Sequence, residues 1–195
     1  MEKRTFSLKK LTQTVLKNGS REMTGRLRGV RIREALEKIL GEEKGALRVV
    51  LDFSGMGAID FSWADEVVAK MISRLWSGEY GEKFLVLKNL NPSQGENIGV
   101  ALERKKLAAL TTGPEGWRMI GSLNNYLIHT LNRVMKKRQL TPRELSEEEG
   151  IEMNTSGTRL LNLYKKRLVV RGEGPMMGRD EAHRGRQYIY QSLLS

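Results

Sequence analysis

The 195-residue sequence contains no cysteine and only two histidines, His129 and His183. Disulfide bonds, thiolate catalysis and cysteine–zinc sites are therefore excluded, and a histidine-rich metal site is not expected. No run of residues approaches the roughly 18 apolar positions of a membrane span, and the first ten residues lack the apolar segment of a signal peptide. We therefore expect a cytoplasmic protein with no cofactor, no metal and no membrane contact.

Acidic residues are also few. The sequence has 23 Asp and Glu residues and 34 Lys and Arg residues, which gives a net charge of +11. A surplus of this size favours a polyanionic partner, although composition alone does not separate that from a solvated surface. The surplus is densest at the end of the chain. Residues 153–195 hold eight Lys/Arg against three Asp/Glu, whereas residues 1–120 hold 21 against 15.

In the first 120 residues, short apolar runs alternate with amphipathic stretches, which predicts strands alternating with helices. The strands are expected at residues 4–8, 47–53 and 84–87, and the helices at residues 9–16, 26–40 and 93–106. Two further strands, at residues 108–111 and 117–120, are expected to form a hairpin across Gly113-Pro114. This alternation indicates an α/β layer with a mixed sheet.

The helix expected over residues 26–40 has an apolar side and a basic first half. Its inward positions are predicted to be Leu27, Val30, Leu36, Ile39 and Leu40. Its arginines are Arg26, Arg28, Arg31 and Arg33. We expect these arginines to form a solvated face, with contact to nucleic acid as the less favoured alternative.

A tight turn and a helix start follow the strand expected at residues 47–53. Residues 54–57, Ser-Gly-Met-Gly, allow the turn because glycine accepts positive φ. Ser62, with Asp65 three residues later, precedes apolar positions that share one helical side: Val67, Val68, Met71, Ile72 and Leu75. The pattern predicts that Ser62 caps the helix.

Residues 52–62, Asp-Phe-Ser-Gly-Met-Gly-Ala-Ile-Asp-Phe-Ser, are similar to the central motif of STAS (anti-anti-sigma-factor-like) domains. The continuation Ser-Trp-Ala-Asp-Glu resembles a divergent STAS-like group. Similarity extends over residues 26–40 and 84–104, so it covers about half of the chain. Phe61 and Trp63 depart from the family pattern, which has serine and glycine there.

The resemblance implies a phosphoswitch or partner-binding site formed by Asp60, Ser62 and Trp63. Ser62 matches the serine that is phosphorylated in regulatory members, but it could equally act only as a helix cap. The nearby acidic residues favour the cap, because they would repel a phosphate. Trp63 could form an apolar partner surface or belong to the core. Catalysis by the acidic residues is not expected, because no phosphate loop, catalytic histidine arrangement or serine elbow accompanies them.

From residue 121 the sequence predicts a helix at 122–137, a short helix, a turn, a helix from 154, and strands at 168–171 and 187–191. Thr141-Pro-Arg-Glu144 is a strong helix start, with a threonine cap, a proline in the first turn and a glutamate at the third position. Leu160, Leu161 and Leu163 are expected to face inward. The element order, and residues 140–194 in detail, resemble winged helix-turn-helix domains.

That resemblance implies that the helix from residue 154 contacts duplex DNA and that the glycine-rich loop after it forms a wing. The expected contact residues of the helix are Asn154, Thr155, Ser156, Thr158, Arg159, Asn162, Lys165 and Lys166. Those of the wing are Arg179, Arg184 and Arg186. Asparagine can pair with adenine in the major groove, and loop arginines suit the minor groove or phosphates. The alternatives are that Thr155 or Ser156 caps the helix and that the basic side chains are solvated.

The sequence therefore predicts an α/β STAS-like domain over residues 1–120 and an α+β winged helix-turn-helix domain over residues 121–195, with residues 122–137 as its linker and first helix. The favoured function is that of a non-enzymatic prokaryotic transcription regulator. Its first domain would bind a protein partner or assemble a homodimer, and its second would bind double-stranded DNA. One alternative is a partner-switching protein-interaction module, and another is an accessory subunit of an enzyme.

Overall fold

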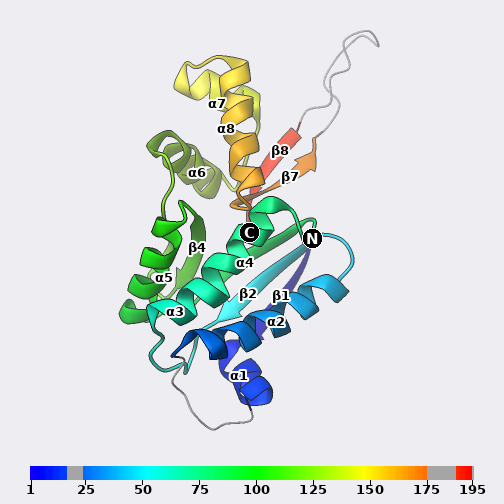
Figure 1. The fold of residues 1–195 in the computed structure, drawn as a ribbon. Helices are drawn as coiled ribbons and strands as arrows, with labels where there is room; N and C mark the ends of the chain where they lie inside the picture. Colours follow the sequence, from blue (N-terminus) through cyan, green and yellow to red (C-terminus); the bar gives the residue numbers. More distant parts are fainter. Residues whose placement is uncertain (17–23, 175–187, 195) are drawn as a thin grey trace. The chain divides into compact units, whose positions relative to one another are not determined.

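The computed structural model describes residues 1–16, 24–174 and 188–194. The chain forms two compact units, Met1–Leu123 and Asn124–Ser195 (Figure 1). The predicted domain boundary, between residues 120 and 121, falls just before the observed one. Each unit contains helices and a sheet, so the fold is mixed α/β. Within the described ranges, no helix has both the length and the apolar content that crossing a membrane requires.

The first unit is built around a five-stranded sheet with the order β1-β2-β3-β4-β5. Its strands are β1 (Glu2–Ser7), β2 (Leu47–Asp52), β3 (Lys83–Lys88), β4 (Ala108–Gly113) and β5 (Gly116–Gly121). The first four strands run parallel, and β5 pairs with β4 in the opposite direction. The predictions of a mixed sheet and of a hairpin across Gly113-Pro114 are therefore confirmed.

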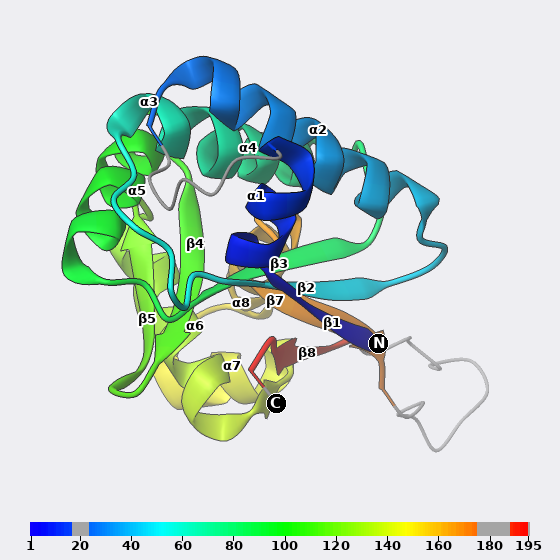
Figure 2. The ribbon, with the colours of Figure 1, turned by 90° about the horizontal axis from the view of Figure 1, so that it is seen from below.

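The helices of the first unit all pack on one face of this sheet (Figure 2). They are α1 (Leu8–Leu16), α2 (Arg26–Glu42), α3 (Phe61–Ala64), α4 (Lys70–Ser77) and α5 (Pro92–Arg104). A π-helical turn, Asp65–Ala69, connects α3 directly to α4. Alternate strand residues such as Val49 and Leu51 point into the core beneath the helices. Trp63 is buried there, edge-on to Phe53 with ring centroids 6.3 Å apart.

The buried stripe of α2 differs from the predicted one. Leu27 was expected to face inward, but it is 83% exposed. The buried positions are Gly29, Ile32, Arg33, Leu36 and Leu40, which fall on one side of the helix. The stripe includes a glycine because α2 closely approaches the helix that contains Glu66: a Cβ at residue 29 would lie 2.9 Å from Glu66 Cβ. It includes an arginine because Glu66 supplies an ionic partner.

The second unit contains three helices and three antiparallel strands among its described residues. In chain order these are α6 (Asn125–Lys137), β6 (Gln139–Leu140), α7 (Pro142–Glu149), α8 (Met153–Lys165), β7 (Val169–Glu173) and β8 (Tyr188–Ser192). The strand order is β6-β8-β7. The sequence did not predict β6, which has too few residues to show an alternating pattern.

Local signals set the limits of α7 as predicted. Thr141 and Glu144 form a reciprocal capping box at its start, and Gly150 ends it in the left-handed conformation with φ 62°. The core of the unit is made of fully buried apolar side chains from its helices: Leu127, Leu131, Val134, Leu145, Leu160 and Leu163. This core holds α8 against α6 and α7.

Candidate nucleic-acid interface and partner site

The orientation of α8 is set by its buried residues. Ser156, Leu160 and Leu163 are fully buried, and about 100° separates successive residues of an α-helix. The side of α8 that faces away from the core therefore carries the exposed residues Asn154, Thr158 and Lys165. All three were predicted contact residues. The Thr158 hydroxyl donates its hydrogen to the Asn154 carbonyl at 2.8 Å, so its oxygen remains available only as a hydrogen-bond acceptor.

One flank of α8 forms an open groove with α6. Thr155, Thr158, Arg159 and Asn162 line this groove of about 390 Å³ together with Asn154 and Tyr126. The Arg159 guanidinium lies 5.4 Å from the centroid of the Tyr126 ring and 2.9 Å from Glu149 Oε2. Arg159 is therefore held in place by intramolecular contacts. Lys166 follows α8 directly, and burial lowers the pKa of its ammonium group.

Ser156 has a different position from the predicted one. It is fully buried, and its hydroxyl contacts the carbonyl oxygens of Pro142 at 2.7 Å and Met153 at 2.8 Å. These contacts join the start of α8 to the start of α7, so the prediction that Ser156 contacts DNA is wrong. The cap alternative is wrong too, because Glu152 occupies the N-cap position of α8. No side chain caps the first amides of α8 within the described part of the chain.

The acidic turn at the end of α7 is neutralised within the unit. Glu148 pairs with Lys137 and, at 2.9 Å, with Arg133. The hydrogen bond from Lys137 is the largest cause that lowers the pKa of Glu148. Glu149 pairs with Arg133 at 3.1 Å and with Arg159 at 2.9 Å. These carboxylates therefore leave the outward side of α8 without strong local repulsion of an anion.

The predicted wing residues Arg179, Arg184 and Arg186 lie outside the described residues. The strands on either side are described, and an arginine that the sequence did not single out connects them to α8. The Arg171 guanidinium lies between two tyrosine rings, 4.6 Å from the centroid of Tyr164 and 4.4 Å from that of Tyr188. Arg171 pairs with Tyr190 across the two strands, so Tyr188, two residues earlier, is its diagonal neighbour on the same face.

In the first unit, Asp60 performs the role that was predicted for Ser62. Its Oδ1 accepts from the Trp63 amide at 2.8 Å, and its Oδ2 accepts from the Gly25 amide at 2.8 Å. The predicted Ser62 cap is wrong because the helix begins two residues earlier than that cap implies, at Phe61, and aspartate is an equally good N-cap. Ser62 is half-buried in the first turn.

Trp63 does not form a surface for a partner. Its side chain is fully buried, and its indole N–H has no hydrogen-bond partner among the residues that the structure describes. The prediction that Trp63 contacts a partner is therefore wrong, and the core alternative is confirmed. Phe61 is only partly buried, and the Arg104 guanidinium lies 4.6 Å from its ring centroid.

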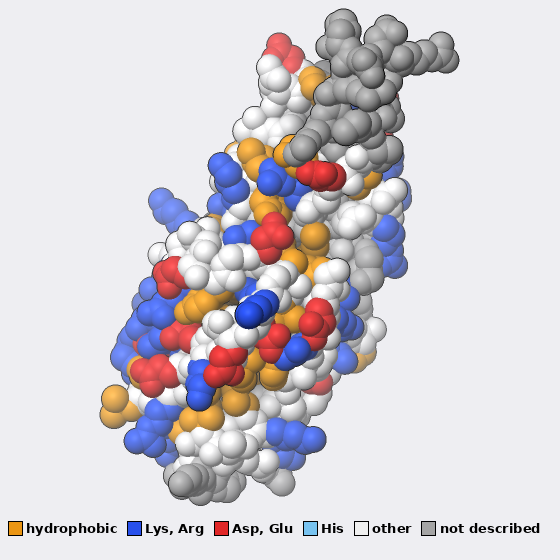
Figure 3. Space-filling model, turned by 90° about the vertical axis from the view of Figure 1, so that its right-hand side faces the viewer, with side chains coloured by type: hydrophobic (Ala, Val, Ile, Leu, Met, Phe, Trp, Pro, Cys, Tyr) orange, Lys and Arg blue, Asp and Glu red, His pale blue; other side chains and the backbone are white. Residues whose placement is uncertain are grey.

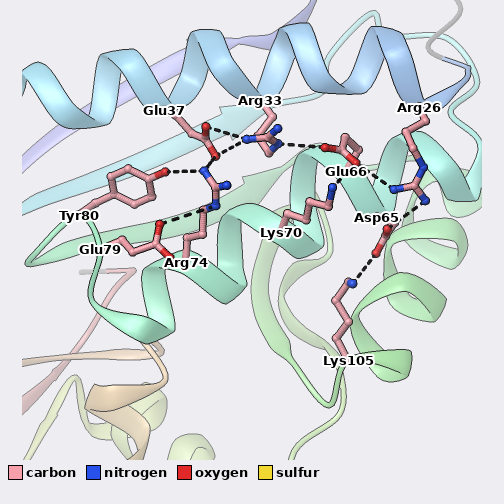
Figure 4. A network of polar contacts seen from close by, with 10 residues as sticks. All are labelled: Arg26, Arg33, Glu37, Asp65, Glu66, Lys70, Arg74, Glu79, Tyr80 and Lys105. Atoms are coloured by element: carbon pink, nitrogen blue, oxygen red, sulfur yellow. Dashed lines mark hydrogen bonds and ion pairs between the residues drawn. The ribbon is translucent and has the colours of Figure 1, made fainter.

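Asp65 and Glu66, which were expected to repel a phosphate on Ser62, are surrounded by cations (Figure 4). Glu66 is 1% exposed and lies within 3.0 Å of Arg26, 3.2 Å of Arg33 and 2.6 Å of Lys70. Asp65 pairs with Arg26 at 3.4 Å and with Lys105 at 3.1 Å. Each of these two carboxylates is therefore paired with at least two cations.

The same network corrects the prediction for the arginines of α2. Arg33 is buried and shares its charge between Glu66 and Glu37, whereas Arg28 and Arg31 are exposed. Basic and acidic side chains also interleave on the face drawn in Figure 3, where no large region of one sign is seen. Much of the first unit's charge is thus used in holding its helices together.

The remaining acidic candidate, Asp52, accepts hydrogen bonds from the loop that follows it and from Asn89. Its Oδ1 accepts from the Ser54 amide, the Ser54 hydroxyl and the Asn89 amide group at 2.9, 2.7 and 3.0 Å. Burial opposes its charge, but these hydrogen bonds prevail and lower the pKa of Asp52. Among the described residues, no group of three or more His, Asp or Glu side chains is placed to hold a metal ion.

No protein-family model matches the chain, and no curated protein matches its sequence. The functional assignment therefore depends on the residues and their geometry. Two features carry the most information: the outward side of α8, and the helix start at Asp60 with its ionic network.

Asp60 and Ser62 can be separated by their effects on stability. We expect Asp60→Ala to lower the free energy of unfolding by about 1–2 kcal/mol, because it removes the cap of α3 and the acceptor of the Gly25 amide. Ser62→Ala should change it by less than about 0.5 kcal/mol. Urea unfolding of both variants measures this difference. Equal losses would contradict the assignment of the cap to Asp60.

The Glu66 network should make the first unit sensitive to acid. Burial opposes the charge of Glu66, but hydrogen bonds from Lys70 and Arg33 outweigh it and bring its pKa below the ordinary value of 4.5. A carboxylate with a lowered folded pKa contributes stability that is complete above its unfolded pKa and is lost as the pH falls through the folded one. Stability should therefore fall below pH 4.5.

Glu66→Gln should remove that part of the acid dependence, and at neutral pH it should cost about 3 kcal/mol because it leaves buried cations without their partner. Glu42→Gln is the matched control, since its exposed pair with Lys38 should contribute only about 0–1 kcal/mol. Urea midpoints measured above and below pH 4.5 test this. Parallel pH profiles for wild type and Glu66→Gln would disprove it.

Proposed function

We propose that this protein is a prokaryotic, cytoplasmic transcription regulator without enzymatic activity. In this proposal the second unit is a winged helix-turn-helix domain that binds double-stranded DNA. The first unit is a STAS-like domain that binds a protein partner or assembles a homodimer. The observation that carries the proposal is the polar outward side of α8, presented by a helix–strand–helix–helix–strand–strand unit with the sheet order β6-β8-β7.

The chemistry of α8 suits the major groove, which is wide enough to admit a helix. The Asn154 amide group can pair with adenine, and the Thr158 hydroxyl oxygen can accept a hydrogen bond from a base amino group. Lys165 lies one turn or more beyond them and would neutralise a phosphate. The uncapped amides at the start of the helix favour the same negative charge. These groups together support DNA as the ligand.

Within this proposal the other candidate residues take different roles. Arg159, which is held by Glu149 and Tyr126, would position the groove side of α8, and Thr155 and Asn162 line that groove beside it. Lys166, directly after α8, would contribute a further cation near the end of the helix. The wing arginines remain part of the proposal as contacts to phosphates or the minor groove.

Two features support the STAS-like assignment of the first unit. Its helices pack on one side of the sheet, and a strand and a turn lead into the helix that Asp60 caps. The exposed start of α2 is the best candidate for the partner surface. It combines Leu27 with the exposed Arg28 and Arg31, and it is tied to Asp60 through Gly25. A partner with an acidic, partly apolar surface would fit. A homodimer would supply two α8 helices for paired half-sites.

The DNA proposal is tested in the full-length protein with Lys165→Ala. We expect weaker binding to all duplexes and a slope of log affinity against log salt that is smaller by about 0.9, the value of one lost phosphate contact. Lys44→Ala is the control, because it removes the same charge from an exposed position in the first unit. Equal effects of the two substitutions, or no DNA affinity in the wild type, would disprove the proposal.

The alternative, a partner-switching interaction module, is favoured by one observation. Arg26 and Lys105 both contact Asp65, one helical turn after Ser62, so a phosphate on Ser62 would meet positive charge. A phosphoserine there could compete for Arg26 and loosen the contact between α2 and the helix that Asp60 caps.

Ser62→Asp tests this alternative, because Asp60 still caps the helix while a charge is added. If Ser62 is a switch, Ser62→Asp should alter DNA affinity, or the effect of cell extract on it, and Ser62→Ala should not. Ser93→Asp is the matched control, since Ser93 is exposed at the equivalent position of α5, two residues after its cap. Binding that is indistinguishable among all four proteins would rule out the switch.

A further inference from the structure

The outward side of α8 contains one apolar residue that the sequence predicted to be buried. Leu161 lies between two core leucines in sequence, but Leu160 and Leu163 are fully buried and Leu161 is only partly so. It follows Leu160 by about 100° around the helix axis and precedes Leu163 by about 200°. Leu161 therefore points away from the core of this unit.

Helical spacing places Leu161 within the polar stripe described above. Residues three and four apart are neighbours on a helix surface, and Leu161 is three residues after Thr158 and four before Lys165. Asn154 lies four residues before Thr158. The four residues Asn154, Thr158, Leu161 and Lys165 thus form one continuous row, the outward row, in which Leu161 is partly buried and the other three are exposed.

An apolar side chain in this place needs a partner that is apolar at one point and polar around it. A docking surface for a folded protein would require several neighbouring apolar side chains, yet the other members of the outward row are polar or charged. The major groove offers the required combination, because the methyl group of thymine is an isolated apolar group among hydrogen-bonding base edges and phosphates.

We infer that Leu161 contacts a thymine methyl group in the DNA site, and so makes α8 select thymine at one position of each half-site. The inference rests on the proposed function, because it assigns a specificity-determining residue to the same helix. Asn154 and Thr158 would then contact base edges on one side of this thymine. Lys165 would lie on the other side, where it would meet the backbone.

The test replaces thymine by deoxyuridine, which removes the methyl group and leaves base pairing unchanged. A duplex selected by the full-length wild-type protein is substituted at one thymine at a time, and the dissociation constant is measured for each duplex. We expect one position in each half-site at which deoxyuridine weakens binding about fourfold, the value of one buried methyl group. Leu161→Ala should lose that sensitivity, so that its affinities for the two duplexes agree.

Val100→Ala is the control, because it also truncates an apolar side chain at an exposed position of the first unit, where Val100 on α5 is 40% exposed. It should keep the wild-type sensitivity to deoxyuridine. Leu161→Met, which conserves the apolar volume, should keep part of it and serves if Leu161→Ala fails to fold.

The outcomes separate the two proposals. A wild-type protein that binds no duplex overturns the proposed function. A wild-type protein that binds DNA, but responds to no single deoxyuridine, overturns the role of Leu161 and leaves DNA binding intact. A response that persists unchanged in Leu161→Ala also overturns the role of Leu161, because another residue must then contact the methyl group.

Discussion

A charged carboxylate that is removed from water determines the arrangement of the first unit. Glu66 is almost completely buried, and a buried charge is tolerated only when opposite charges and hydrogen bonds surround it. Arg33 of α2 and Lys70 of the next turn supply these contacts. Since Gly29 allows α2 to approach closely at the same point, a shift of α2 along its axis would separate Glu66 from Arg26 and Arg33 and leave it only Lys70. Gly25 directly precedes α2, so the hydrogen bond from its amide to Asp60 depends on the same ion pairs.

Much of the secondary structure could be predicted from local patterns. The strand at Leu47–Asp52 and the hairpin of β4 and β5 have the expected apolar content and turn residues, and Thr141 and Gly150 mark the ends of α7 by their own chemistry. Such signals act within a few residues, so they are visible without the fold. They fail where two candidate N-caps lie two residues apart, as Asp60 and Ser62 do, because both residue types cap helices well.

The errors have a common physical origin in contacts between distant residues. Arg33 is predicted outward by its charge, and only the approach of Glu66 from another helix makes its burial favourable. Ser156 is a typical polar helix residue, but it is used to bond the Pro142 carbonyl. Three leucines within four positions of α8 cannot all face inward on a helix, and the packing of Leu160 and Leu163 decides that Leu161 does not. In each case the sequence shows the residue type but not its neighbour.

The π-helical turn at Asp65–Ala69 has a consequence for the length of the ionic network. Residues four apart in an ideal α-helix drift about 40° per step around the axis, so residues 66 and 74 would diverge by about 80°. A wider turn takes up part of that drift. Glu66 and Arg74 can therefore both face α2, where they meet Arg33 and Glu37. The additional residue in the turn thus keeps the ion pairs between the two helices aligned over more than two turns. Deletion of any residue from this segment would rotate Arg74 away from Glu37.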